Sequence, residues 1–269
     1  MDDWGDMSKR SADEITKFLE DQQDAIAELI RAGRTKEASD IIVAYSKTAR
    51  QGIFDLEYQG KKVGDIQEFK NARVLTDRMF KRIWDCYWNA APFPLQDLMM
   101  FNDTNFMIVL YQGFDVVGVF NQISATLDPR LRSWIMLSFY PYLYEITGKL
   151  ILAYTNVLKV DGTIDAIGQA LKTLSERYHL AELDDCFDYF LRNAIDHSQF
   201  IIKKLDAGLI EAWNVEGARP GPKRQYEIAS IFTMTTKMIF FLLAYHVSWY
   251  ETVVELDRRQ GLLDPKGAR

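Results

Sequence analysis

Apolar side chains recur at intervals of three and four residues through most of this 269-residue chain. This spacing places them on one face of an α-helix, so it is typical of helices that bury one side against a core. Glycine and proline are sparse, with 15 and 7 residues, which favours long helices over a sandwich or barrel. The clearest run comprises Leu183, Cys186, Phe187, Phe190, Leu191, Ala194 and Ile195. The sequence therefore predicts an all-α fold, mainly a helical bundle.

Capping signals and breakers delimit the expected helices. Ser11-Ala12-Asp13-Glu14 and Asp65-Ile66-Gln67-Glu68 have the form of capping boxes, Gly33 fits a helix end, and Asp128-Pro129 fits a helix start. Residues 163–178 and 182–197 are expected as two further helices, and a last one runs from about Arg224 to Arg259. Residues 106–120 fit either a helix or two strands. We expect two regions, an unassigned helical region at 1–127 and a second helical region at 128–269.

The helical pattern changes after residue 197. Residues 200–205 and 209–213 are short apolar runs on either side of Asp206-Ala207-Gly208. Glycine readily adopts the backbone angles of a tight turn, so this arrangement predicts one short β-hairpin near residues 200–214. Residues 216–222 are rich in glycine and proline and are expected to form a loop.

The sequence Arg192-Asn193-Ala194-Ile195-Asp196-His197 lies just before this hairpin. It combines a permanent cation, an amide and an imidazole within two helical turns. Arginine can hold a phosphate with two parallel hydrogen bonds, and histidine can transfer a proton near neutral pH. Asn193 and His197 are four residues apart and share a helix face, so the amide could orient the ring. These residue types suit chemistry on a phosphodiester.

This motif resembles the Arg-(x4–6)-His signature of HEPN domains, and the likeness extends more loosely over 128–269. The resemblance implies a metal-independent endoribonuclease that acts as a dimer, with one motif from each protomer in a shared cleft. It implies that His197 is a general acid or base, that Arg192 stabilises charge on the phosphoryl oxygens, and that Asn193 orients His197 or the phosphate. It also implies a toxin or antiviral-defence role, with an antitoxin or activator protein as partner. Residue 199 is Gln, so the His-x-Tyr continuation of one HEPN subfamily is missing.

The helical geometry leaves an alternative open. At 100° per residue, Arg192 lies nearly opposite His197 around a straight helix, so one chain does not direct both at one ligand. A homodimer through the helices around 182–197 would remove this difficulty. Otherwise Arg192 and Asp196 form an ordinary i, i+4 ion pair and His197 is a boundary residue. The second function hypothesis is accordingly a catalytically inert helical module that binds a protein or nucleotide.

The net charge of −6 means that RNA contact would need a local basic patch. Lys203, Lys204, Lys223 and Arg224 are the candidates, with ordinary solvated surface as the alternative. The chain has three histidines and two cysteines, and no Cys-His ligand spacing surrounds Cys86 or Cys186. We therefore expect no metal or other cofactor, and two buried thiols in a reducing compartment.

The N-terminal residues are acidic and lack the apolar stretch of a signal peptide. The most apolar segment, 228–250, contains Lys237 near its middle, and a charge at the centre of a membrane span is costly. We therefore expect a buried core helix, a cytoplasmic protein and no membrane. A membrane-associated factor that uses this segment is a third hypothesis.

Overall fold

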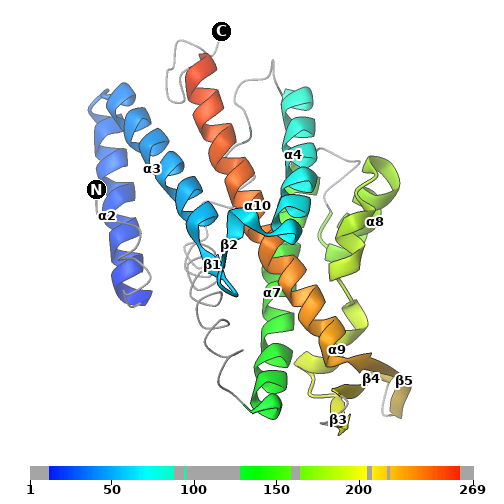
Figure 1. Cartoon of the computed structure of the whole chain (residues 1–269). Helices are drawn as coiled ribbons and strands as arrows, with labels where there is room; N and C mark the ends of the chain where they lie inside the picture. Colours follow the sequence, from blue (N-terminus) through cyan, green and yellow to red (C-terminus); the bar gives the residue numbers. More distant parts are fainter. Residues whose placement is uncertain are drawn as a thin grey trace. The chain divides into compact units, whose positions relative to one another are not determined.

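The computed structural model describes residues 12–87, 94, 128–158, 164–204, 208–216 and 219–260. These residues are mainly helical, with a small antiparallel sheet near the C-terminus (Figure 1). The predicted mainly helical class is therefore confirmed. The expectations for Ser11, for residues 106–120 and for the turn at Asp206-Ala207 lie outside the described residues.

The chain divides into two compact units. Unit 1 takes the described residues within Met1–Val119 and Leu243–Arg269, and unit 2 takes those within Phe120–Leu242. Helix α10 (Ile228–Gln260) therefore begins in unit 2 and ends in unit 1. The division expected at residues 127/128 would assign all of this helix to the second region, whereas the structure groups its last part with the N-terminal helices.

Unit 1 is built from helices and one short ribbon of two strands. Its elements are α2 (Ala12–Arg31), α3 (Thr35–Asp55), β1 (Glu57–Tyr58), β2 (Lys61–Lys62), η1 (Val63–Asp65) and α4 (Gln67–Tyr87), with the end of α10. Gly33 has a φ of +73° between α2 and α3, as its predicted role at a helix end requires. The expected capping box at Asp65 is wrong, because Asp65 ends the η1 turn and α4 begins at Gln67.

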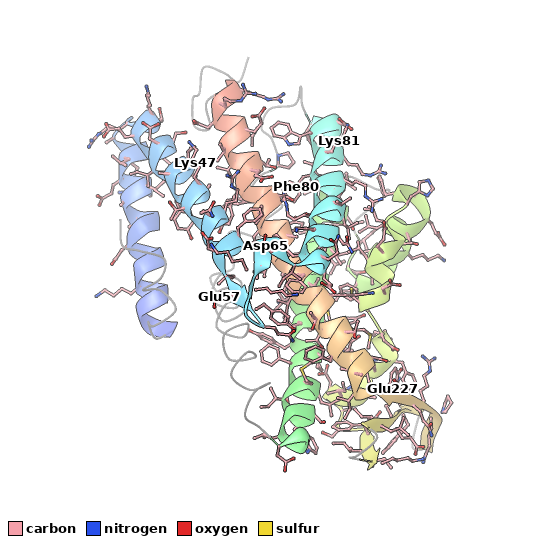
Figure 2. The ribbon with its side chains drawn as sticks, in the orientation of Figure 1. Lys47, Glu57, Asp65, Phe80, Lys81 and Glu227 are labelled. Carbon is pink, nitrogen blue, oxygen red and sulfur yellow. The ribbon has the colours of Figure 1, made fainter. Side chains whose placement is uncertain are left out.

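Helices α4 and α10 share the core of unit 1. The rings of Phe80, labelled in Figure 2, and Tyr245 meet edge to face with centroids 5.0 Å apart. Arg73 donates to Ser248 Oγ and to Glu251 Oε2, both at 2.8 Å. The partly buried guanidinium of Arg73 thus forms two hydrogen bonds to α10, which stabilise the contact between the two helices.

Unit 2 carries the predicted motif. Its elements before the sheet are α7 (Pro129–Val157), α8 (Ile167–Tyr178), η2 (Ala181–Cys186) and α9 (Tyr189–Asp196). Helix α7 begins at Pro129, as predicted, and continues through Pro141. It buries a broad apolar face that includes Leu137, Tyr140, Leu143, Leu150, Ile151 and Tyr154.

The expectation of one helix over 182–197 is wrong. A 3₁₀ helix ends at Cys186, and α9 starts afresh at Tyr189. Asp188 has an extended backbone, and its Oδ1 accepts a hydrogen bond of 2.9 Å from the Leu191 N–H, so it caps α9. Tyr140 on α7 accepts from the Asp188 N–H at 2.8 Å and donates to the Cys186 carbonyl at 3.3 Å. The tyrosine therefore satisfies the backbone groups on both sides of the break.

The sheet has three antiparallel strands, in the order β3 (Phe200–Lys204), β4 (Leu209–Glu216) and β5 (Arg219–Glu227). The sequence predicted one hairpin, so β5 is an additional strand, and α10 begins at Ile228 rather than near Arg224. Pro220 and Pro222 lie in the strand β5, not in the predicted loop over 216–222. Among the described residues β5 pairs only with β4, and proline is tolerated in a strand that lies at a sheet edge.

Helix α10 is long and apolar enough to cross a membrane, with a mean hydropathy of 1.6 over its most apolar window. However, 56% of that window is buried inside the protein, and every residue from Met238 to Tyr250 is buried. Core helices of soluble proteins have this same character, so the helix is weak evidence for a membrane span.

Candidate functional site

Helix α9 is short, and three contacts determine where it lies. Leu191, Ala194 and Ile195 are buried on one face. Asp188 caps its first turn, and the hydroxyl of Tyr226 on β5 donates to Asp188 Oδ2 at 2.8 Å. Burial and this hydrogen bond to the carboxylate raise the pKa of Tyr226, which therefore stays protonated and donating. The polar residues of the motif occupy the remaining surface of the helix.

The side chain of Arg192 is held by acidic and amide groups. Its Nη2 donates to Glu145 Oε1 on α7 at 2.5 Å, and its Nη1 donates to Asn193 Oδ1 at 2.8 Å. Its Nε lies 3.0 Å from Asp196 Oδ2, which makes an ion pair although the N–H is not aligned for a hydrogen bond. The side chain is only 25% exposed. The i, i+4 pair with Asp196 that the sequence allowed is therefore present, together with an acid from another helix.

His197 is exposed at the C-terminal end of α9. Its backbone N–H closes the helix on the Asn193 carbonyl at 3.1 Å. Within the described part of the chain its ring has no hydrogen bond or ion pair. Asn193 was expected to orient His197 or a phosphate, but its side-chain oxygen accepts from Arg192 instead. The three motif residues thus divide into an anchored Arg192–Asn193 pair and a free imidazole.

A cleft of about 520 Å³ borders the motif, between the first half of α7, the end of α9 and the start of β3. Its lining residues are Trp134, Leu137, Ser138, Pro141, Tyr142, Glu145, Ile195, Asp196, Ser198 and Phe200. Arg192 and His197 do not line it, but Asp196 and Ser198 flank His197 in the chain. Both acids that hold Arg192 lie in its wall. Sequence reasoning missed the roles of Trp134 and Glu145, although a lone glutamate in the apolar 131–158 run was a usable signal.

The predicted basic patch is partly neutralised. Glu211, buried on the middle strand β4, pairs with Lys203 on β3 and with Lys223 on β5, the latter at 2.8 Å. These two hydrogen bonds lower the pKa of Glu211 below its usual range. The guanidinium of Arg224 lies 4.2 Å from the ring centre of Phe190. The sheet therefore brings Lys203 and Lys223 together around an acid, and Arg224 stacks on an aromatic ring; the Lys204 side chain lies outside the described set.

Cysteine and metal chemistry are limited in the described residues. No group of three or more histidine, cysteine, aspartate or glutamate side chains is arranged there to hold a metal. Cys186 is buried, and desolvation raises the pKa of its thiol to about 11. The expectation that Cys86 is buried is wrong, because this residue is exposed near the end of α4.

No family model matches this chain, and no curated protein or solved structure was found to be similar to it. The likeness to HEPN domains thus rests on the motif residues and their surroundings.

Proposed function

We propose that unit 2 is a metal-independent endoribonuclease whose active site contains the α9 motif. The observation that carries this proposal is the exposed imidazole of His197 at the C-terminal end of α9. In the preceding turn of the same helix, hydrogen bonds hold the guanidinium of Arg192 in a defined orientation. An exposed imidazole is accessible to a substrate, and its ring nitrogens can accept or donate a proton. The HEPN resemblance adds a toxin or antiviral-defence role, with an antitoxin or activator protein as partner.

The chemistry follows from the two side chains. The ribose 2′-hydroxyl attacks the adjacent phosphorus as His197 takes its proton, and the bond to the 5′-oxygen breaks as that oxygen receives a proton from an imidazolium or from water. The products are a 2′,3′-cyclic phosphate and a free 5′-hydroxyl. Arg192 would stabilise the charge on the phosphoryl oxygens. Lys203, Lys204, Lys223 and Arg224 would contribute to backbone attraction, with Lys203 and Lys223 weakened by Glu211.

The proposed enzyme acts as a homodimer. Arg192 points toward Glu145 on α7, whereas His197 is exposed at the helix end, so the two side chains of one chain face different surroundings. A two-fold axis near α9 would place Arg192 of one protomer beside His197 of its partner. Phosphate would then compete with Glu145 and Asp196 for the guanidinium.

A complementation experiment tests chemistry and dimer together. Arg192→Ala and His197→Ala are each expected to lower the cleavage rate of single-stranded RNA in excess chelator by about 10²–10⁴-fold. When the two inactive variants are mixed and allowed to exchange subunits, each mixed dimer regains one complete composite site. Recovery of roughly a quarter of the wild-type rate is expected for random pairing.

Three results would contradict the proposal. Cleavage of an all-deoxy substrate excludes attack by the 2′-hydroxyl, and a requirement for divalent metal excludes the metal-independent mechanism. Full activity of His197→Ala would remove this residue from the chemistry.

The second candidate function is a catalytically inert module that binds a partner. The specific observation in its favour is that Arg192 is already engaged within the chain, by hydrogen bonds to Glu145 and Asn193 and an ion pair with Asp196. Absence of RNA cleavage by the wild-type protein, with binding of a partner retained in Arg192→Ala or His197→Ala, is the result that this candidate predicts.

A further inference from the structure

The cleft beside α9 combines aromatic rings with carboxylates. Trp134 is 52% exposed, and its ring lies against that of Phe200 with centroids 5.6 Å apart. Leu131, one turn earlier on α7, is also exposed. Exposed large apolar side chains that gather beside a cleft are typical of a surface that binds another molecule.

The charge of this cleft indicates what it would bind. Glu145 and Asp196 contribute two negative charges, and Arg192 supplies one positive charge. The Glu145 side chain is 42% exposed, and each carboxylate uses one oxygen on Arg192. An ionised carboxyl group has about four acceptor positions, so both acids retain acceptor capacity for a further donor. The local balance of −1 attracts a cation and disfavours a phosphate.

We propose that this cleft binds the guanidinium group of an arginine side chain presented by a protein partner. A planar guanidinium stacks on aromatic faces and donates up to five hydrogen bonds, so it matches a site made of aromatic rings and carboxylates. Trp134 and Phe200 supply the aromatic contact, and Glu145 and Asp196 accept the hydrogen bonds. The apolar surface at Leu131 and Trp134 would cover the partner's neighbouring residues.

Occupation of the cleft would also affect Arg192, a step that rests on the proposed ribonuclease. A second guanidinium would share the carboxylates of Glu145 and Asp196 that now hold Arg192. The interaction of these two acids with Arg192 would then be weaker. Arg192 would then be more available to a phosphate. The partner's arginine would in this way raise the cleavage rate without touching the RNA.

Binding is tested first and without RNA. The probe is N-acetyl-arginine methylamide, titrated into the full-length protein while the indole N–H signals are followed by NMR, with Trp134→Phe used to assign the Trp134 signal. The matched ligand is the citrulline analogue, which has nearly the same shape but no charge. A saturable shift of the Trp134 signal by the arginine probe, with a millimolar dissociation constant typical of one small group, is expected. The citrulline analogue should bind at least about fivefold more weakly.

Variants locate the site. Glu145→Gln and Phe200→Ala, which both keep the Trp134 signal, should each weaken binding of the probe by roughly fivefold, whereas Glu176→Gln, which removes an exposed acid on α8, should leave its affinity unchanged. Three results would each overturn the proposal. They are saturable binding that persists in both cleft variants, equal binding of the citrulline analogue, and displacement of the probe from the Trp134 surface by single-stranded RNA. The last result would make the cleft a nucleic-acid site.

The coupling to Arg192 has a separate readout. The arginine probe should raise the RNA cleavage rate of the wild-type protein and have no such effect on Glu145→Gln. An unchanged wild-type rate at saturating probe overturns the coupling, while the NMR result stands. The binding titration is also performed on His197→Ala, so that failure of the proposed chemistry and failure of the proposed cleft are distinguished.

Discussion

Asp188 stabilises the start of α9 through both of its carboxylate oxygens, with Leu191 on one and Tyr226 on the other. Asp188→Ala is expected to lower the free energy of unfolding by about 2 kcal/mol, because a lost cap and a lost hydrogen bond cost about 1 kcal/mol each. Denaturant unfolding measures this loss, and hydrogen exchange should show faster exchange of the α9 amides. Asp185→Ala, which removes only an exposed pair with Lys237, should cost less than about 1 kcal/mol. Equal losses in the two variants would contradict the role assigned to Asp188.

Glu211 makes stability depend on acid pH. Its pKa is lowered by hydrogen bonds from Lys203 and Lys223, so the folded state binds a proton less readily than the unfolded state. This contribution is present above the ordinary carboxyl pKa and is lost as the pH falls from there through the lower folded-state pKa. Glu211→Gln should therefore show a flatter dependence of its thermal midpoint over that range. A slope as steep as that of the wild type would show that this acid does not carry the effect.

At the scale of elements, the contact between α7 and α8 depends on one glycine. A Cβ at Gly148 would lie 2.8 Å from Ile167 Cγ1 and closer still to Cδ1. Gly148→Ala is expected to lower the free energy of unfolding by about 1–3 kcal/mol through overpacking, although alanine favours helix. Denaturant unfolding at neutral pH measures the change.

Two controls accompany this substitution. Gly168 on α8 has nothing within 4 Å of its Cβ position, so Gly168→Ala should stabilise the protein by up to about 1 kcal/mol. Combining Gly148→Ala with Ile167→Val should cost less than the sum of the single changes, because the valine lacks the Cδ1 atom that meets the new methyl group. Strict additivity would place the strain elsewhere.

At the scale of the whole molecule, the proposed enzyme requires a homodimer near α9. Tyr189 is 66% exposed at the start of this helix, and exposed tyrosine is enriched at protein interfaces. We expect a dimer in sedimentation experiments at micromolar concentration without detergent. Tyr189→Glu should shift the protein toward monomer and leave its circular dichroism unchanged. A wild-type monomer with full ribonuclease activity would contradict the shared site.

The sequence by itself determined what depends on neighbours along the chain. Apolar spacing specified the helical class, Asp128-Pro129 specified the start of α7, and Gly33 marked a helix end, because periodicity, capping and backbone freedom are local properties. The same local information located the motif Arg192 to His197 near the end of a helix.

Only the tertiary structure decided what depends on residues far apart in the chain. The predicted helix over 182–197 breaks because Tyr140, more than forty residues earlier, satisfies the backbone groups at the break. Residues 219–227 form a strand, despite two prolines, because β4 offers its other edge for pairing. Arg192 faces Glu145 for the same reason, since α7 brings the acid to it. Hydrogen bonds and ion pairs between distant residues outweigh local conformational preferences of about 1 kcal/mol. The spacing of apolar residues along a helix does not reveal these long-range interactions.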